Sequence, residues 1–590
     1  MAKTALLLAF PLAAVAFGVK PSPKPKGPPL TSEQRTAQTL VKRMTLSDQV
    51  AQMVVIPAQG RVYSIRSAEY RKFRHLVRDL HVGGITINNR SEYSLVRHAE
   101  PQTLAVFLNQ MQRLAKTPLL VSSDFERGAS MRVSGTTLFP YSMAYAAAND
   151  VEGVRFEGLM AAREARALGI QWIFAPVSDV NINPENPVIN LRSYGEDPEQ
   201  VAHFVAAFID GAHSDPNNRV LVTAKHFPGH GDTAANSHVD LPQLSASRER
   251  LESVEFVPFR AAIAHGIDSI MTAHLTVPAL EPEEIPATVS ANVTRTLRED
   301  LRFSDLIITD AMDMQGLSKQ FPPAEAAVRA VVAGADVLLM PPDPERAIHA
   351  IVSAVQRGRI PKSRIEQSAM RIMAAKIRVG LMKRKLVDVD GIAEAIDSQE
   401  AEARAQETSD RAVTLVKNEN GLLPISKDSH PCMIVTREAR ASTTGLRMAQ
   451  EVQSRARGAR LVVLDSSLPL PALEAAIGDT ANCSAVILET SVTASDTRTN
   501  MAIGGDLGAF ATHLMEGPAP VVLVSLGSPY LLGAFPKAAA SVAAFSPTVP
   551  SEVSVAKALF GDIPIGGRLP VTIPGLALRG DGIELPVRSH

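Results

Sequence analysis

This chain of 590 residues has few cysteines, few aromatic residues and almost no net charge. It contains 2 cysteines, 1 tryptophan and 5% aromatic residues, and its formal net charge at pH 7 is −1. Cys432 and Cys483 are far apart and lack metal-ligand spacing, so no disulfide framework carries the fold; the two thiols are either paired or free. The balanced charge argues against a nucleic-acid partner, because binding to nucleic acid requires a basic surface.

The apolar run near the N-terminus is too short to span a membrane comfortably. It covers residues 5–19 and follows Lys3, and residues 14–16 within it offer small side chains for cleavage. This pattern predicts a signal peptide at 1–20, with a membrane-anchoring or disordered start as the alternative. The Pro- and Lys-rich stretch 21–34 is then a stiff tether. We therefore expect an exported protein, periplasmic or extracellular, with no stable membrane span after processing.

From about residue 35, apolar strand-like runs alternate with segments of helical spacing. The eight expected strands are 53–56, 84–87, 119–122, 172–176, 220–224, 269–273, 306–308 and 336–340. Eight strands, each followed by a helix, are the count of a (β/α)8 barrel, which we place at 35–395. A doubly wound sheet also alternates in this way, but no Gly-rich dinucleotide turn follows the first strand.

A second α/β pattern follows a charged stretch. Residues 396–412 are rich in Glu, Ala and Arg and predict a helical linker. The expected strands beyond it are 413–416, 433–435, 461–464, 485–488, 521–525 and 541–545. This pattern predicts a C-terminal α/β sandwich domain at 413–590.

Polar residues stand at or just past several barrel strands. They are Asp124, Asp179, Lys225, His226, His274 and Asp310. In a barrel these positions converge on one C-terminal mouth. Any single one of these residues is explained equally well as a helix cap or as a member of an ion pair. Polar residues at the ends of five of the eight strands, however, indicate a functional site.

Residues 225–238 combine a strand end with a loop of small residues, and they carry three histidines, one lysine and one aspartate. A metal site built from His226, His230, Asp232 and His238 matches no compact ligand template, so no metal is expected. His230 is expected to be a packing and hydrogen-bonding element of this loop.

Asp310 ends a buried strand and is followed by an apolar turn. A lone carboxylate in such a mouth can act as a nucleophile or as an electrostatic stabiliser. Asp313 lies three residues further on, in the first turn of the expected helix. We therefore prefer Asp310.

Several motifs resemble those of β-N-acetylglucosaminidases of glycoside hydrolase family 3. They are KHFPGHGD at 225–232 with SH at 237–238, FAPVSDVN at 174–181, NPVINLRSYGEDP at 186–198, DFERG at 124–128 with Arg132, and TD at 309–310. VTLVKN at 413–418 and GGRLPVTIP at 566–574 are similar to the C-terminal sandwich domain of the same family. The resemblance covers nearly everything after the tether.

The resemblance implies a retaining exo-glycosidase that removes terminal β-linked N-acetylglucosamine from peptidoglycan fragments or chitooligosaccharides. Asp310 would be the nucleophile and His238 the acid/base. The contacts carried over to the sugar are Asp124, Arg132, Arg192, Lys225 and His226. No cofactor is implied, the partner is a carbohydrate, and we expect a monomer.

Two positions depart from the family pattern. Asn236 stands where an Asp usually forms a dyad with the catalytic His. An amide can hold the ring but cannot stabilise the imidazolium as an anion does, unless Asp232 or Asp240 takes that place. Arg127-Gly-Ala also replaces the usual Gly-Gly-Arg, which predicts a differently shaped turn.

The sequence leaves three alternatives open. One is a family 3 β-glucosidase or xylosidase, against which the His-bearing loop argues. Another is a sugar-binding protein whose catalysis is impaired by Asn236. The third is a phosphorylase, because a neutral His leaves room for an anionic acceptor.

Overall fold

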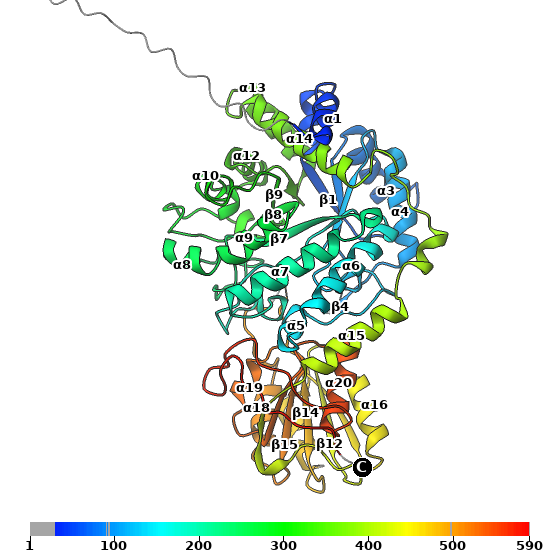
Figure 1. Cartoon of the computed structure of the whole chain (residues 1–590), viewed down its shortest axis with the longest axis vertical. Coiled ribbons are helices and arrows are strands. Elements are labelled where there is room, and N and C mark those ends of the chain that lie inside the picture. The colour runs from blue at the N-terminus through cyan, green and yellow to red at the C-terminus, as the bar shows by residue number, and fades with distance from the viewer. Residues whose placement is uncertain (1–29, 90, 93–94, 479, 496–497, 589–590) are drawn as a thin grey trace, which may run out of the picture.

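The computed structural model describes residues 30–89, 91–92, 95–478, 480–495 and 498–588, so the expected signal peptide and most of the expected tether lie outside the described residues. The described chain forms two α/β units that lie end to end (Figure 1). Helix α1 (Ser32–Val41) packs against α14 (Lys362–Arg378) of the first unit through an apolar cluster that includes Ala37 and Met373. None of the described helices has the length and apolar character needed to cross a membrane.

The first unit is a barrel of eight parallel strands. Their order around the barrel is β10 (Leu338–Leu339), β1 (Val54–Ala58), β2 (Gly84–Ile87), β5 (Leu120–Ser123), β6 (Trp172–Ile173), β7 (Leu221–Phe227), β8 (Ser269–Thr272) and β9 (Leu306–Thr309). A parallel bridge between Ile308 and Val337 joins the two end strands. Strands such as β5 and β7 are buried along their whole length, as expected for parallel strands covered by helices.

Helices surround this barrel. The helices of the first unit, besides α1 and α14, are α2 (Leu46–Gln52), α3 (Ala68–Arg74), α4 (Pro101–Leu114), α5 (Ser142–Ala147), α6 (Val151–Leu168), α7 (Pro198–His213), α8 (Arg248–Ser253), α9 (Phe256–Ala264), α10 (Ala291–Arg295), α11 (Gln315–Ser318), α12 (Pro323–Ala333) and α13 (Pro344–Gln356). Each predicted barrel strand overlaps an observed strand, so the predicted barrel fold is confirmed. A small hairpin, β3 (Ser91–Glu92) with β4 (Leu95–Val96), was not expected from the sequence.

The second unit is a six-stranded sheet with helices on both faces. Its strand order is β11 (Thr414–Asn418), β16 (Ala540–Ala543), β15 (Val521–Ser525), β14 (Val486–Thr490), β12 (Cys432–Arg437) and β13 (Arg460–Asp465), and β11 alone among these described strands runs antiparallel to its neighbour. Met433 and Val435 of β12 join the apolar cluster under α16 (Leu446–Arg455) and α20 (Val549–Leu559). Ile434, between them, faces the opposite cluster under α17 (Leu470–Gly478), α18 (Leu507–Leu514) and α19 (Leu531–Ala534). This alternation is the period of two of a strand buried on both faces.

Helix α15 (Gln399–Ala412) lies between the two units (Figure 1). Met143 and Leu191 of the barrel unit share an apolar cluster with the C-terminal domain. Polar contacts also join the units: the Glu196 carboxylate accepts hydrogen bonds from the backbone N–H and the hydroxyl of Thr572, at 2.8 and 2.7 Å. The domains are therefore packed together and not merely tethered.

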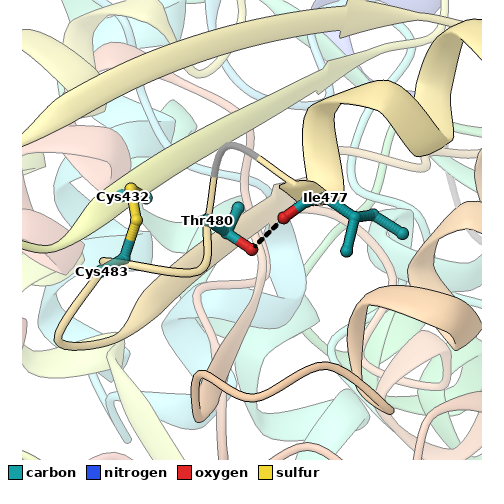
Figure 2. Close-up of a disulfide and its surroundings, with 4 residues drawn as sticks. All are labelled: Cys432, Ile477, Thr480 and Cys483. Atoms are coloured by element: carbon teal, nitrogen blue, oxygen red, sulfur yellow. Dashed lines mark hydrogen bonds between the residues drawn. A yellow bond between two sulfur atoms is a disulfide. The ribbon is translucent and has the colours of Figure 1, made fainter.

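Cys432 and Cys483 form a disulfide, which settles the alternative left open by the sequence. Figure 2 shows the bond between the start of β12 and the loop that precedes β14. In the same loop the Thr480 hydroxyl donates a hydrogen bond of 2.7 Å to the Ile477 carbonyl. The bond closes a chain loop with a sequence separation of 51 residues.

We expect the Cys432→Ala/Cys483→Ala variant to lose about 2–4 kcal/mol of unfolding free energy in the C-terminal domain, because a disulfide restricts the unfolded chain. Urea unfolding followed by far-UV circular dichroism measures this loss. Trp172, fully buried in the barrel, gives a separate fluorescence signal for the first unit. As a control, a reductant should destabilise the wild type and leave the variant unchanged; coincident unfolding curves for the oxidised wild type and the variant would contradict the expectation.

Candidate active site

A pocket of about 370 Å³ opens at the C-terminal mouth of the barrel. Seven of the eight predicted site residues line it: Asp124, Arg132, Arg192, Lys225, His226, His238 and Asp310. The eighth, Asn236, lies behind His238 and is 2% exposed. Ala494 and Ser495 of the C-terminal domain line the pocket as well. The site is therefore built by both units.

One side of the pocket is a network of alternating charges centred on Lys225. The Lys225 ammonium contacts Asp124 at 2.9 Å and Glu126 at 2.6 Å, and its side chain is only 2% exposed. Arg132 pairs with Asp124 at 2.8 Å, and Arg192 donates two hydrogen bonds of 2.8 Å to Glu126. Each buried charge thus has an opposite charge in contact, as the cost of desolvation requires.

The network also fixes the protonation states of its members. Burial raises the pKa of the Asp124 carboxyl, but Lys225 and Arg132 outweigh it and lower that pKa to about 2. Burial lowers the pKa of Lys225, but Asp124 and Glu126 reverse this effect and raise it above its usual value. The carboxylates and the ammonium are therefore all charged near neutral pH.

Lys225 and His226 both face the pocket although they are consecutive residues of β7. Side chains alternate along a regular strand, but the register of β7 against β8 shifts between Lys225 and Phe227. Such an irregularity re-aims a side chain. The His226 Nδ1 lies 2.7 Å from the Asp179 carboxylate, and the Arg192 guanidinium lies 3.4 Å from its Nε2.

His230 has the packing role expected of it. Its ring nitrogens contact the Thr233 hydroxyl at 2.7 Å and the Ser237 hydroxyl at 2.9 Å. Its backbone N–H donates to Asp179 at 2.7 Å. Burial, assisted by the nearby His226, lowers the pKa of His230 to about 4. The imidazole is therefore neutral and braces the loop.

Asp310 directly follows β9, lines the pocket and is half-buried. Burial raises the pKa of its carboxyl, but His226, His274, His238 and the Ala311 N–H together bring that pKa below its usual value. The Ala311 N–H donates to Asp310 Oδ1 at 2.7 Å. Asp313 lines the pocket too but is exposed. The strand end thus holds an ionised carboxylate in a fixed position.

His238 is held by Asn236. The Asn236 Oδ1 atom accepts a hydrogen bond from the His238 backbone N–H and contacts the His238 Nδ1, both at 2.9 Å. Asp232, considered from the sequence as a substitute for the missing carboxylate, pairs with Arg250 at 3.1 Å, and Asp240 is exposed. The Asn236 amide therefore makes the contact to His238 that the family resemblance leads one to expect of an Asp at this position.

The segment after Asp310 supports the His238 loop from the barrel side. The Gln315 and Gly316 N–H groups donate to the His238 and Ser237 carbonyls at 3.3 and 3.2 Å. A Cβ atom on Gly316 would lie 2.9 Å from the Ser237 carbonyl oxygen and 2.8 Å from that of Asp240. A glycine is therefore needed where the two segments meet.

The four residues considered for a metal cluster each have separate partners. His226 contacts Asp179, His230 contacts Thr233 and Ser237, Asp232 contacts Arg250, and His238 contacts Asn236. Within the described part of the chain, no group of three or more His, Cys, Asp or Glu side chains is arranged to hold a metal ion.

Sequence reasoning missed several residues of the pocket. Glu126 joins Lys225 to Arg192. Asp179, one of the strand-end residues expected at the mouth, is fully buried and orients His226. Arg127, in the turn expected to differ, lines the pocket and stacks over the Tyr141 ring at 4.9 Å. Glu126 and Arg127 stand within the DFERG motif, just after a predicted strand. Their position in the sequence was therefore a usable signal that they lie at the mouth of the barrel. No sequence motif of the barrel indicated that Ser495, from the C-terminal domain, would line the pocket.

Comparisons with known proteins agree on one family. Residues 45–375 match the glycosyl hydrolase family 3 N-terminal domain, and residues 413–579 match the family's C-terminal domain. The chain is 31% identical over 371 residues to a beta-N-acetylglucosaminidase/beta-glucosidase of Cellulomonas fimi, covering 61% of this chain and 64% of that protein. It is 31% identical over 340 residues to beta-hexosaminidase A of Pseudoalteromonas piscicida, covering 53% of this chain and 56% of that protein.

A solved structure is similar over almost the whole chain. It is a glycoside hydrolase family 3 beta-N-acetylglucosaminidase from Paenibacillus sp. str. FPU-7, with a TM-score of 0.79 and 31% identity over 89% of this chain and 98% of that chain. By contrast, the matches to the Cellulomonas and Pseudoalteromonas proteins span less than two thirds of those proteins' own lengths, 64% and 56%.

We expect Lys225→Met to lower the unfolding free energy of the barrel by about 3 kcal/mol, because it leaves the buried Glu126 carboxylate and the partly buried Asp124 carboxylate with one cation each. Lys116→Met is the matched control: Lys116 also pairs with an aspartate, Asp48 at 3.2 Å, but is 60% exposed. The control should cost under about 1 kcal/mol. Urea unfolding followed by Trp172 fluorescence compares the two, and equal losses would contradict the role of the buried network.

Proposed function

The chain belongs to glycosyl hydrolase family 3, and from this premise we propose that it is a retaining exo-β-N-acetylglucosaminidase. The observation that carries the proposal is a strand-end carboxylate, Asp310, sharing one pocket with a loop imidazole, His238. The activities named for the relatives and for the Paenibacillus structure are of the same kind. The volume of the pocket, about 370 Å³, falls in the usual range of small-molecule sites, about 300–1,000 Å³.

Asp310 is the proposed nucleophile. Its carboxylate oxygen attacks the anomeric carbon while the bond to the leaving oxygen breaks, which gives a covalent glycosyl-enzyme. Water then displaces the Asp310 carboxylate with a second inversion, so the anomeric configuration is retained. The lowered pKa of Asp310 supports this role, because the attacking group has to be ionised.

His238 is the proposed acid/base. With Nδ1–H donating to Asn236, the neutral ring carries its lone pair on Nε2, so Nε2 is the atom assigned to proton transfer. In the first step the imidazolium gives its proton to the leaving oxygen. In the second step the neutral ring takes a proton from the attacking water.

Asp124, Arg132, Arg192, Lys225 and His226 are the proposed sugar contacts. Their donors and acceptors suit hydroxyl groups and an acetamido group, and the ion pairs among them hold these groups in place before the sugar arrives. Apolar side chains of Phe174, Met271 and Leu339 also line the pocket.

Terminal N-acetylglucosamine of peptidoglycan fragments or chitooligosaccharides is the proposed natural substrate. The proposed location is outside the cytoplasm, on the basis of the N-terminal sequence pattern at 1–20. We also propose that the protein is a monomer. A β-glucosidase activity is the second candidate, because the name of the Cellulomonas relative includes it.

We expect the wild type to hydrolyse 4-nitrophenyl β-N-acetylglucosaminide faster than the β-glucoside, and Asp310→Asn to abolish turnover of both, because an amide is too weak a nucleophile. Release of 4-nitrophenol measures the rates, and binding of N-acetylglucosamine by calorimetry checks that Asp310→Asn still folds. Faster hydrolysis of the glucoside would overturn the substrate assignment, and a wild type that binds the sugar but cleaves neither glycoside would be a binding protein. Adding phosphate and analysing the product distinguishes phosphorolysis from hydrolysis.

We expect His238→Ala to lower kcat/KM by about 10²–10⁴-fold on a substrate that needs protonation of its leaving group. Azide should restore part of the turnover with an activated substrate, because azide attacks the glycosyl-enzyme without a general base. The product should be the β-glycosyl azide, identified by NMR. Unchanged activity of His238→Ala would remove His238 from the mechanism.

A further inference from the structure

We propose that the C-terminal domain positions the acid/base imidazole through Asn236, whose carboxamide joins His238 to two backbone carbonyls of that domain. The inference rests on the proposed role of His238. It makes Asn236 a positioning residue that requires an amide, and not a weakened substitute for a carboxylate.

The contacts of Asn236 use both ends of its carboxamide. Oδ1 accepts from the His238 backbone N–H and contacts His238 Nδ1, both at 2.9 Å. Nδ2 donates to the Ser495 carbonyl at 3.1 Å and to the Arg498 carbonyl at 2.7 Å. Only one orientation of the amide satisfies all four contacts, because carbonyls accept and N–H groups donate.

A carboxylate at this position would satisfy only half of the contacts. Its second oxygen would face two carbonyl oxygens at about hydrogen-bond distance, with no proton between them. Asn236 is 2% exposed, so water is not available to replace the lost contacts. Burying a charge against like partial charges is costly. The departure from the family's Asp is therefore matched by the surroundings.

An ion pair fixes Arg498 within the C-terminal domain, and the Arg498 backbone N–H donates a hydrogen bond of 3.2 Å to the Ser495 carbonyl. Arg498, whose carbonyl Asn236 contacts, pairs through its guanidinium with Glu438, next to the end of β12. Arg498 also donates to the Ala502 carbonyl at 2.8 Å, and Glu438 accepts from the Gly504 N–H at 3.3 Å. Neither Glu438 nor Arg498 is among the residues that line the pocket.

His238 is thus held between two supports. The segment after Asp310 contacts its loop from the barrel side through Gln315 and Gly316, and the C-terminal domain contacts it through Asn236. Loosening the second support shifts the proton donor but leaves Asp310 and the ion pairs around Lys225 in place. The loss should therefore appear in protonation of the leaving group and not in attack by the nucleophile.

The test compares kcat/KM on two glycosides in the full-length protein. Chitobiose releases a sugar alcohol that needs a proton, whereas the 2,4-dinitrophenyl glycoside of N-acetylglucosamine does not. For Asn236→Ala we expect a loss on the order of 10²-fold on chitobiose and under about 3-fold on the dinitrophenyl glycoside. For Asn236→Asp we expect kcat/KM on chitobiose to fall by about 10-fold rather than to rise.

Arg498→Ala extends the test to a residue outside the pocket. It should reproduce the selective loss on chitobiose, by about 10-fold, because the Arg498 backbone carbonyl is no longer fixed. Arg455→Ala is the matched control: Arg455 lies in the same domain, pairs with Glu451 at 2.6 Å, and is 16% exposed, as Arg498 is. This control should leave both rates unchanged. A gain of tenfold or more in Asn236→Asp, or equal losses on both glycosides in Arg498→Ala, would overturn the proposal.

Hydrogen exchange tests the contact without reference to catalysis. The amide of His238 should exchange faster in Arg498→Ala than in the wild type and in Arg455→Ala, because its acceptor Asn236 loses its fixed partners. Equal exchange in all three proteins would overturn the positioning role even if neither glycoside is cleaved. Absence of glycosidase activity in the wild type, with faster exchange in Arg498→Ala, would instead overturn the proposed function alone.

Discussion

The pocket depends on one buried cation, Lys225, placed between the carboxylates of Asp124 and Glu126. Its ammonium ties the segment after β5 to β7 across the barrel mouth, and Arg132 and Arg192 complete the network. Removing these charges from water is costly, so each is stable only while its partners are in place. Groups held this firmly do not need to reorganise when a polar ligand enters.

The barrel and most of its site could be predicted from the sequence because both follow from local patterns. Apolar runs mark the eight strands, and polar residues at strand ends such as Asp124, Lys225 and Asp310 must share one mouth. The partners of these residues could not be predicted in the same way. Asp179 stood at a strand end and Glu126 within the DFERG motif, but nothing in the sequence paired them with His226 and Lys225 until the fold brought them together. Ion pairing across strands has no local sequence signal.

Asn236 illustrates this limit most clearly. Judged against a family pattern, an amide in place of a carboxylate indicates a weakened dyad. Its two carbonyl partners lie 259 and 262 residues further along the chain, so no local motif announces them. The pairing of Cys432 with Cys483, across 51 residues, was undecidable from spacing for the same reason. Residues whose partners are distant in sequence are the ones for which the sequence alone leaves alternatives open.

The two proposed chemical groups are supported in different ways. Asp310 stands at the end of a barrel strand, where backbone pairing with the neighbouring strands fixes it. His238 stands on a loop, and loops position side chains less precisely than strands do. The domain interface compensates through the contacts of Asn236, and apolar packing around Met143 and Leu191 together with the hydrogen bonds of Glu196 holds the two units together. In the proposed mechanism the geometry of the covalent step is a property of the barrel, whereas the geometry of proton transfer is a property of the contact between domains.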